Sequence, residues 1–176
     1  MLPIVSAHRI LLSPGASGNS AQLAPHAAAL EARGFDVTVV SLPRGKAERA
    51  VPAYRAALGD EGAGAVIGGQ SFGGRVASLL AAEATTAALV CFSYPLHAPG
   101  RQAAWQDRTA HWPRIACPVL LLSGEADPFA EINLLRGAVR QLPDATLVTF
   151  PGLGHSLARM LDRAIPIVAE FIGSNT

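Results

Sequence analysis

The sequence is poor in several features that mark particular classes of protein. Only two of its 176 residues are cysteine, Cys91 and Cys117, and they lie far apart in apolar segments without a CxxC spacing. This usage predicts two buried thiols, with neither a disulfide nor a metal site. Half of the residues are hydrophobic, yet no apolar run reaches the roughly 18 residues that a membrane-spanning helix needs. We therefore expect no membrane span.

The sequence also lacks an excess of charge of either sign. Fourteen Lys and Arg residues against thirteen Asp and Glu residues give a formal net charge of +1, and no Lys/Arg run occurs. Nucleic acid and acidic membranes are therefore poor candidates as partners. The first fifteen residues, MLPIVSAHRILLSPG, contain no charged leader, long apolar segment or small-residue cleavage site. This predicts no signal peptide and a cytoplasmic location.

Short aliphatic segments alternate with helical segments along the chain. The length is near that of one domain, so we expect a single domain over residues 1–176. Near-continuous apolar strands joined by helices predict an α/β protein with a doubly wound, six-stranded, mainly parallel sheet and helices on both faces. The predicted strands are 8–13, 35–42, 64–69, 88–93, 117–124 and 145–150, and the clearest helices are near 51–60, 72–84, 130–142 and the C-terminus.

Three local features predict details of these elements. Pro52 suits the first turn of its helix. Pro166, inside the last helical segment, indicates a kink or a fresh helix start. The stretch from Tyr94 to Cys117 has no clear period and is expected to form a small flap.

A serine enclosed by glycines follows the third predicted strand, in the segment VIGGQSFGGR at 66–75. Neither this segment nor SPGASG at 13–18 matches the dinucleotide fingerprint GxGxxG, and the segment also fails the phosphate-binding pattern GxxxxGK[ST]. It does match GxSxG, in which the serine occupies a strained strand-to-helix turn and small neighbours let strand and helix approach closely. Ser71 is therefore the predicted nucleophile. A close-packed junction with an ordinary serine is the alternative.

A serine nucleophile needs a base, and the base needs an acid that holds its tautomer. On such a sheet the three follow the carboxyl ends of strands in the order serine, acid, histidine. Of five histidines, only His155 follows a late strand and a plausible acid. Asp127 is the predicted acid and Glu125 the fallback, while Asp144 precedes its strand and lies at the wrong end. An N-cap role is the alternative for Asp127.

Further residues are predicted to lie around this site. The backbone N–H groups of Phe72 and Ala16 are the candidate oxyanion donors, and Gly15 is expected to border the substrate. If the first strand separates the second from the third, the sheet order reverses beside these loops, and ligands bind at such points. His97 is assigned to substrate binding, with a hydrogen bond to a loop carbonyl as an equal alternative. Arg75 is expected to anchor the helix surface or a loop more readily than to clamp an anion.

Four segments together resemble the α/β-hydrolase superfamily: GGQSFGGRVAS, CFSYPLHAPG, LLLSGEADPF and GLGHSL. More narrowly, they are similar to a small lid-free, dienelactone-hydrolase-like subgroup that also includes a subunit of the non-specific lethal histone-acetyltransferase complex. The resemblance implies a minimal hydrolase fold with strand order 2-1-3-4-5-6, and Ser71, Asp127 and His155 as nucleophile, acid and base. The chain departs from the pattern at its oxyanion loop, where PGA replaces HGG. It also has serine where dienelactone hydrolases proper have cysteine, so their reaction is not implied.

These residues predict a serine hydrolase of small carboxylic esters or thioesters. It would act on a small-molecule acyl substrate through an acyl-enzyme intermediate and would need no cofactor or metal. Two alternatives use the same fold. One is a non-catalytic interaction module, and the other is an acyltransferase with the same three residues.

Overall fold

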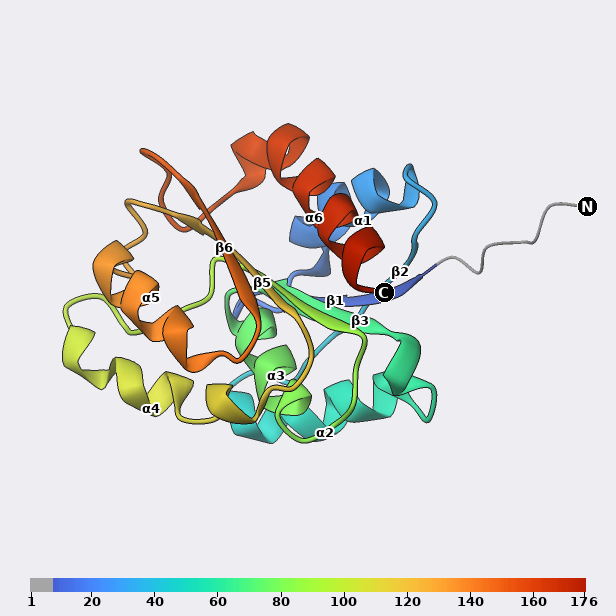
Figure 1. Cartoon of the computed structure of the whole chain (residues 1–176), viewed down its shortest axis with the longest axis horizontal. Coiled ribbons are helices and arrows are strands. Elements are labelled where there is room, and N and C mark those ends of the chain that lie inside the picture. Colours follow the sequence, from blue (N-terminus) through green and yellow to red (C-terminus); the bar gives the residue numbers. More distant parts are fainter. Residues whose placement is uncertain (1–7) are drawn as a thin grey trace, which may run out of the picture.

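Six strands form one parallel sheet in the computed structural model, which describes residues 8–176 (Figure 1). Their order is β2-β1-β3-β4-β5-β6, which confirms the predicted order. The sheet order reverses at β1, so a crevice opens beside the carboxyl ends of β1 and β3. Residues 1–7, part of the stretch from which no leader was predicted, lie outside the described residues. The strands are β1 (Arg9–Ser13), β2 (Asp36–Val39), β3 (Val66–Gln70), β4 (Ala88–Phe92), β5 (Val119–Gly124) and β6 (Ala145–Phe150).

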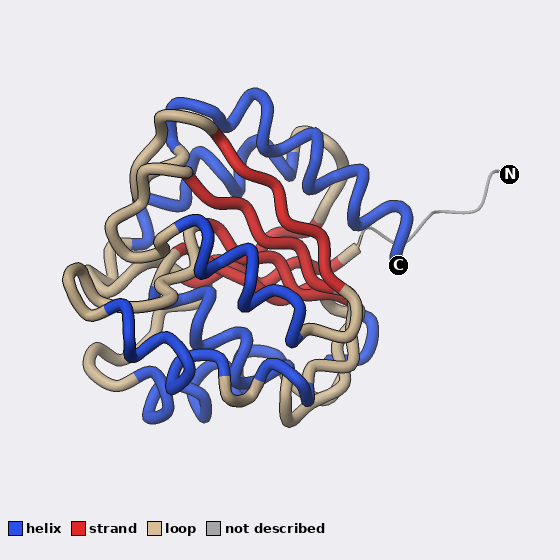
Figure 2. Tube along the Cα trace, turned by 60° about the vertical axis from the view of Figure 1, so that its left-hand side comes forward, coloured by secondary structure: helices blue, strands red, loops and turns tan. Residues whose placement is uncertain are grey.

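Helices cover both faces of this sheet, as predicted, and Figure 2 shows the strands between two helical layers. One face carries α1 and α6, which pack beside each other, and the opposite face carries α2, α3 and α5, with α4 on the same side (Figure 1). The helices are α1 (Ala24–Glu31), α2 (Ala47–Leu58), α3 (Phe72–Ala81), α4 (Trp105–Thr109), α5 (Ile132–Ala138) and α6 (Leu161–Asn175).

Alternate strand residues enter two separate hydrophobic clusters. Leu11 and Ile67 pack on the side of α2 and α3, whereas Ile10, Leu12 and Val66 pack on the side of α1 and α6. Successive side chains point to opposite faces of a strand, so a strand covered on both faces must be apolar at every position. This is why the central strands appear in the sequence as unbroken apolar runs.

The structure contradicts one prediction about a proline and one of the two alternatives given for another. Helix α2 begins at Ala47, so Pro52 lies inside the helix instead of in its first turn. Helix α6 continues through Pro166, so no fresh start occurs there, and the other alternative, a kink, stays a prediction. Both prolines are exposed. Each helix buries an apolar face along its whole length, and this burial outweighs the single backbone hydrogen bond that an internal proline removes.

The stretch from Tyr94 to Cys117 is not a flap. It contains α4, and Tyr94, Trp112 and Ile115 are buried in the cluster beneath α2 and α3. The rings of Tyr94 and Trp112 meet edge to face with centroids 5.0 Å apart. Large aromatic side chains gain more from this burial than the loop loses in freedom, so the segment is part of the core.

Both cysteines are free and buried, which confirms the prediction of two buried thiols. Across residues 8–176, the helices are too short or too polar to cross a bilayer. The same part of the chain holds no group of three His, Cys, Asp or Glu side chains arranged to bind a metal ion.

Candidate active site

Ser71 occupies the turn between β3 and α3. Its backbone takes φ 50° and ψ −115°, a left-handed region that side chains rarely adopt and that costs about 1 to 3 kcal/mol. Its N–H donates to the carbonyl of Phe92 (2.8 Å), which fixes the turn against β4. The strained turn therefore places the serine hydroxyl at the carboxyl edge of the sheet, between the strand and the helix.

Gly69 and Gly73 allow this turn to form. A Cβ atom at either position would collide with the backbone carbonyl oxygen of Ser13, at the end of β1. A Cβ at Gly69 would also lie 2.8 Å from the carbonyl carbon of Gly73. Because the obstructing atoms are backbone atoms, they cannot rotate away. The two outer glycines of GxSxG are thus required by the close approach of β1, β3 and α3.

We expect Gly73→Ala to lower the free energy of unfolding by about 3 kcal/mol, because the new methyl group overpacks this junction. The measurement is a urea unfolding curve. Gly137→Ala is the matched control: a Cβ there meets no atom within 4 Å, and the position lies inside α5. Alanine should raise stability at this helical site by up to about 1 kcal/mol. Equal midpoints for the two variants would contradict the assigned role of Gly73.

Asp127 follows β5 in a tight turn, and its carboxylate is buried. Its Oδ1 accepts a hydrogen bond from the N–H of Phe129 (2.8 Å), which holds the side chain in place. The N-cap of α5 is Glu131, whose carboxylate accepts from the N–H groups of Asn133 and Leu134. Asp127 is therefore not the helix cap, and its second oxygen is free to face the loop after β6.

His155 joins the carboxylate to the serine. Its Nδ1 lies 2.8 Å from Asp127 Oδ2, and its Nε2 lies 2.8 Å from Ser71 Oγ. A carboxylate only accepts hydrogen bonds, so Nδ1 carries the proton and Nε2 accepts from the hydroxyl. The ring of Phe129 lies against the imidazole, with centroids 4.5 Å apart. Three residues that are 28 and 84 positions apart thus form one chain of hydrogen bonds.

The loops that carry Asp127 and His155 are held together by their backbones. The N–H of Ala126 donates to the carbonyl of Leu153 (2.8 Å). Gly124, at the end of β5, packs so closely on Leu153 that a Cβ would collide with that carbonyl. Asp127 and His155 are therefore positioned by backbone contacts between the ends of two neighbouring strands.

Glu125 does not reach the histidine. Its carboxylate accepts from the hydroxyl of Thr149 (2.7 Å) and pairs with Arg136 (3.0 Å). The fallback assignment of Glu125 as the acid is therefore wrong. The carboxylates of Glu125 and Asp127 point in different directions from this turn, so only that of Asp127 faces His155.

The predicted oxyanion donors lie beside the serine. Phe72 is the first residue of α3, so its N–H has no partner within the helix. Ala16, in the loop after β1, shares a cavity lining with Ser71. Gly15 also lies near the serine, since a Cβ on it would lie 3.8 Å from the Cβ of Ser71. The roles of these three residues stay predictions.

His97 lines neither of the cavities that contain Ser71. Its side chain is buried, its Nδ1 lies 2.9 Å from the carbonyl of Ala98, and its Nε2 accepts from the N–H of Glu131 (2.9 Å). Both ring nitrogens are thus occupied within the protein. This corrects the assignment of His97 to substrate binding and favours the alternative, a hydrogen bond that ties two loops together.

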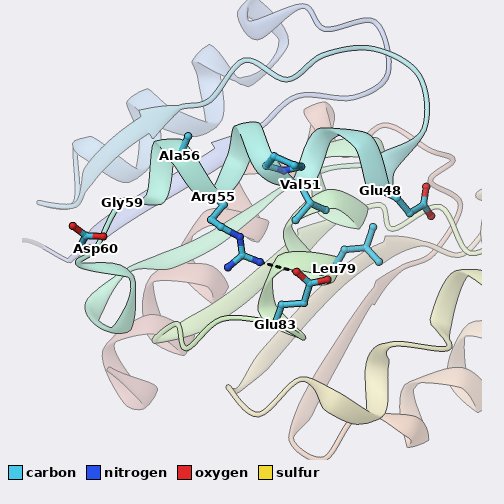
Figure 3. A pocket seen from close by; sticks show the side chains of 9 residues that line it. Glu48, Val51, Arg55, Ala56, Gly59, Asp60, Leu79 and Glu83 are labelled. Atoms are coloured by element: carbon cyan, nitrogen blue, oxygen red, sulfur yellow. Dashed lines mark hydrogen bonds and ion pairs between the residues drawn. The ribbon is translucent and has the colours of Figure 1, made fainter.

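A groove of about 630 Å³ lies between α2 and α3, apart from the three residues (Figure 3). Its most prominent polar contact is an ion pair between Arg55 and Glu83 (2.6 Å), both half exposed. It holds neither a serine nor a histidine. The chemistry described above therefore belongs to the crevice at the end of the sheet and not to this groove.

Several residues at the crevice were not predicted from the sequence. The ring of Phe129 lies against His155, while Lys46 and Arg108 line a cavity beside Ser71. They come from three loops or helix ends without a shared motif. Phe129 follows Asp127 by two residues, and this was the one hint in the sequence that any of them lies near the site. The same spacing occurs in many turns that have no such role.

A doubly wound parallel sheet with a serine at its strand-to-helix turn and an aligned histidine and aspartate defines the class of α/β hydrolases. The chain belongs to the α/β hydrolase domain family, whose model matches residues 43–163. Hydrolase activity is the broad function that this membership supports. The narrower resemblance to dienelactone-hydrolase-like proteins stays a prediction.

Solved structures share this fold over nearly the whole chain. A monoacylglycerol lipase from Paleococcus ferrophilus is 16% identical with a TM-score of 0.81, and the match covers 96% of this chain and 95% of the lipase. An enol-lactonase from Burkholderia xenovorans is 18% identical with a TM-score of 0.78 over 95% and 92%. Est1E from Butyrivibrio proteoclasticus, solved with ferulic acid, is 17% identical with a TM-score of 0.76 over 95% and 88%. These similarities establish the fold alone.

Proposed function

We propose that this protein is a serine hydrolase that cleaves small carboxylic esters or thioesters. The observation that carries the proposal is the continuous hydrogen-bond chain from Asp127 through His155 to Ser71, with both links at 2.8 Å. Similar folds occur in a lipase and a lactonase, whose names denote the cleavage of carboxylic esters. The geometry and these neighbours support acyl chemistry at Ser71.

The reaction begins with attack of Ser71 Oγ on the acyl carbon while His155 Nε2 takes the hydroxyl proton. Collapse of the tetrahedral intermediate breaks the bond to the leaving group, which receives that proton from His155. An acyl-enzyme on Ser71 remains. Water then attacks the acyl carbon while His155 accepts a proton from it. Collapse of this second intermediate breaks the bond to Ser71 Oγ, which receives that proton from His155, and the carboxylic acid is released. Asp127 keeps the imidazole in the required tautomer and stabilises its positive charge.

The tetrahedral intermediates carry a negative charge on the former carbonyl oxygen. The N–H of Phe72, at the start of a ten-residue helix, and the N–H of Ala16 are the proposed donors to it. The positive end of the α3 dipole adds to this stabilisation. Donors that are already in place need little reorganisation as the charge develops, which lowers the barrier.

A fluorophosphonate probe tests the proposal without knowledge of the substrate. We expect covalent labelling of the folded protein, with the adduct mapped by mass spectrometry to Ser71, because only an activated serine attacks such a probe. The unfolded protein in urea is the control and should stay unlabelled, since the hydrogen-bond chain is then lost. A folded protein without an adduct at Ser71 would favour the non-catalytic module.

Hydrolysis and acyl transfer are separated by their products. We expect the acyl group of a small ester to appear as the free carboxylic acid in buffer. Its quantitative appearance on an added alcohol or amine would instead favour an acyltransferase.

A further inference from the structure

Two cavities of similar size meet at Ser71. We call one the neutral cavity, of about 560 Å³, which is lined by Gly15, His26, Gln70 and His155 as well as the serine. The other, of about 610 Å³, is the basic cavity, which is lined by Lys46, Glu48, Arg75 and Arg108 as well as the serine. An ester whose carbonyl lies at Ser71 therefore has two differently charged spaces for its two halves.

The basic cavity carries an excess of positive charge. Its lining holds three cationic side chains, Lys46, Arg75 and Arg108, against one carboxylate, that of Glu48. The excess of two positive charges exceeds the formal net charge of +1 of the whole chain. Basic side chains are thus concentrated next to the predicted nucleophile.

The two arginines are not fully satisfied by the protein. Arg75 pairs with Glu48 (2.6 Å) through one nitrogen, while its Nε–H is buried and has no hydrogen-bond partner among the described residues. Arg108 donates one hydrogen bond, to the carbonyl of Pro95 (2.9 Å). Burial, and next the positive charge of Arg75, lower the pKa of Arg108. The fixed cations therefore repel each other, and an anion between them would relieve this repulsion.

The start of α2 adds to the positive field. Gly45, Lys46, Ala47 and Glu48 all line the basic cavity, and the N-cap residue Lys46 makes no side-chain capping bond. The N–H groups of Ala47 and Glu48, the first two residues of this twelve-residue helix, have no partners inside the helix. Figure 3 shows Glu48 at this end of α2, apart from the Arg55–Glu83 pair. The side chain of Glu48 therefore balances Arg75 but leaves Lys46 and Arg108 without an acidic partner in the lining.

The positions of the two cavities fix which half of an ester each receives. His155, which delivers a proton to the leaving group, lines the neutral cavity and not the basic one. The leaving group therefore lies in the neutral cavity and the acyl group in the basic one. Burial lowers the pKa of His26 to about 4, so the neutral cavity carries no charge from this side chain at pH 7.

We propose that the basic cavity binds an acyl group that carries a carboxylate of its own. The substrate class is then the half-esters or half-thioesters of dicarboxylic acids, with Lys46, Arg75 and Arg108 facing the distal carboxylate. This inference rests on the function proposed above and specifies its substrate. Water cleaves the ester bond, and the products are the dicarboxylic acid and the alcohol or thiol.

The test compares two esters that differ only in the distal charge: 4-nitrophenyl hydrogen adipate and 4-nitrophenyl hexanoate. After subtraction of the uncatalysed rates, we expect kcat/KM to be at least about tenfold higher for the charged ester at low salt. The preference should shrink as salt is raised, because ions screen the cavity charges. Each ratio is measured on one protein sample, so differences in folded fraction cancel.

Two variants that remove charges of opposite sign should change the ratio of kcat/KM values in opposite directions. Lys46→Gln should lower the ratio about threefold, and Glu48→Gln should raise it, because the second change removes the single acidic side chain. Arg49→Gln is the control for Lys46→Gln, because it also removes one positive charge. Arg49 is exposed on α2 and lies outside the cavity, so this change should leave the ratio unchanged.

The outcomes separate the two proposals. Equal kcat/KM values for the charged and uncharged esters, or a ratio unmoved by Lys46→Gln and Glu48→Gln, would overturn the anionic acyl site while the hydrolase proposal stands. Turnover of neither ester, together with no fluorophosphonate adduct, would overturn the hydrolase proposal and this inference with it.

Discussion

Ser71→Ala should reduce kcat for a small aryl ester by about 10⁴-fold or more, with little change in the free energy of unfolding. In the proposed mechanism the hydroxyl oxygen of Ser71 attacks the acyl carbon, and neither His155 nor a bound water replaces it at the same position. The side chain that remains is smaller and creates no collision in the turn. Initial rates of 4-nitrophenyl ester hydrolysis, measured together with urea unfolding curves, check both parts of this expectation.

Ser174→Ala is the matched control for the loss of a serine hydroxyl. Ser174 is exposed near the end of α6, outside both cavities at Ser71. Its variant should retain the rate of the unchanged protein. If Ser71→Ala also retained that rate while folded, the nucleophile would have to be another group and the proposed mechanism would fall.

Asp127→Asn should lower kcat by about 10³- to 10⁴-fold while the fold is kept. Asparagine retains an oxygen that can accept from the N–H of Phe129, so the turn after β5 is preserved. Its amide nitrogen, however, would face His155 Nδ1 in place of Oδ2 and would donate to it. The ring proton then moves to Nε2, which can no longer accept the proton of Ser71. The loss should therefore appear in kcat more than in KM.

Glu125→Gln is the control for Asp127→Asn, because it removes a negative charge two residues away in the same turn. Glu125 contacts Arg136 and Thr149 and not the histidine, so this change should alter kcat less than about threefold. If instead Glu125→Gln abolished activity and Asp127→Asn did not, the acid would be misassigned.

Much of the fold could be predicted because its signals are local. Unbroken apolar segments such as ALVCF (Ala88–Phe92) indicate strands covered on both faces, and helices between them leave a parallel sheet as the solution. The predictions that failed depended on tertiary packing. Pro52 is tolerated inside α2 because that helix buries one face along its length. Trp112 and Tyr94 draw their segment into the core, although it has no regular period.

The grouping of Ser71 with Asp127 and His155 could also be predicted, because topology limits where the partners of a serine at this turn can lie. The sequence could not exclude Glu125 as the partner of His155. Two acids that lie two residues apart in one turn differ only in the direction of their side chains. The same holds for His97, whose burial and two hydrogen bonds depend on a loop 34 residues away.

By itself the sequence determined the alternation of strands and helices, the glycines that a strained turn requires, and the candidate serine, acid and histidine that follow the ends of strands. Periodicity and chain order are properties of a linear pattern, and so they suffice for these features. Only the tertiary structure decided which acid faces His155 and that Lys46, Arg75 and Arg108 surround one cavity. Those features arise where separate crossovers bring their ends together, and no spacing along the chain encodes the directions in which side chains then point.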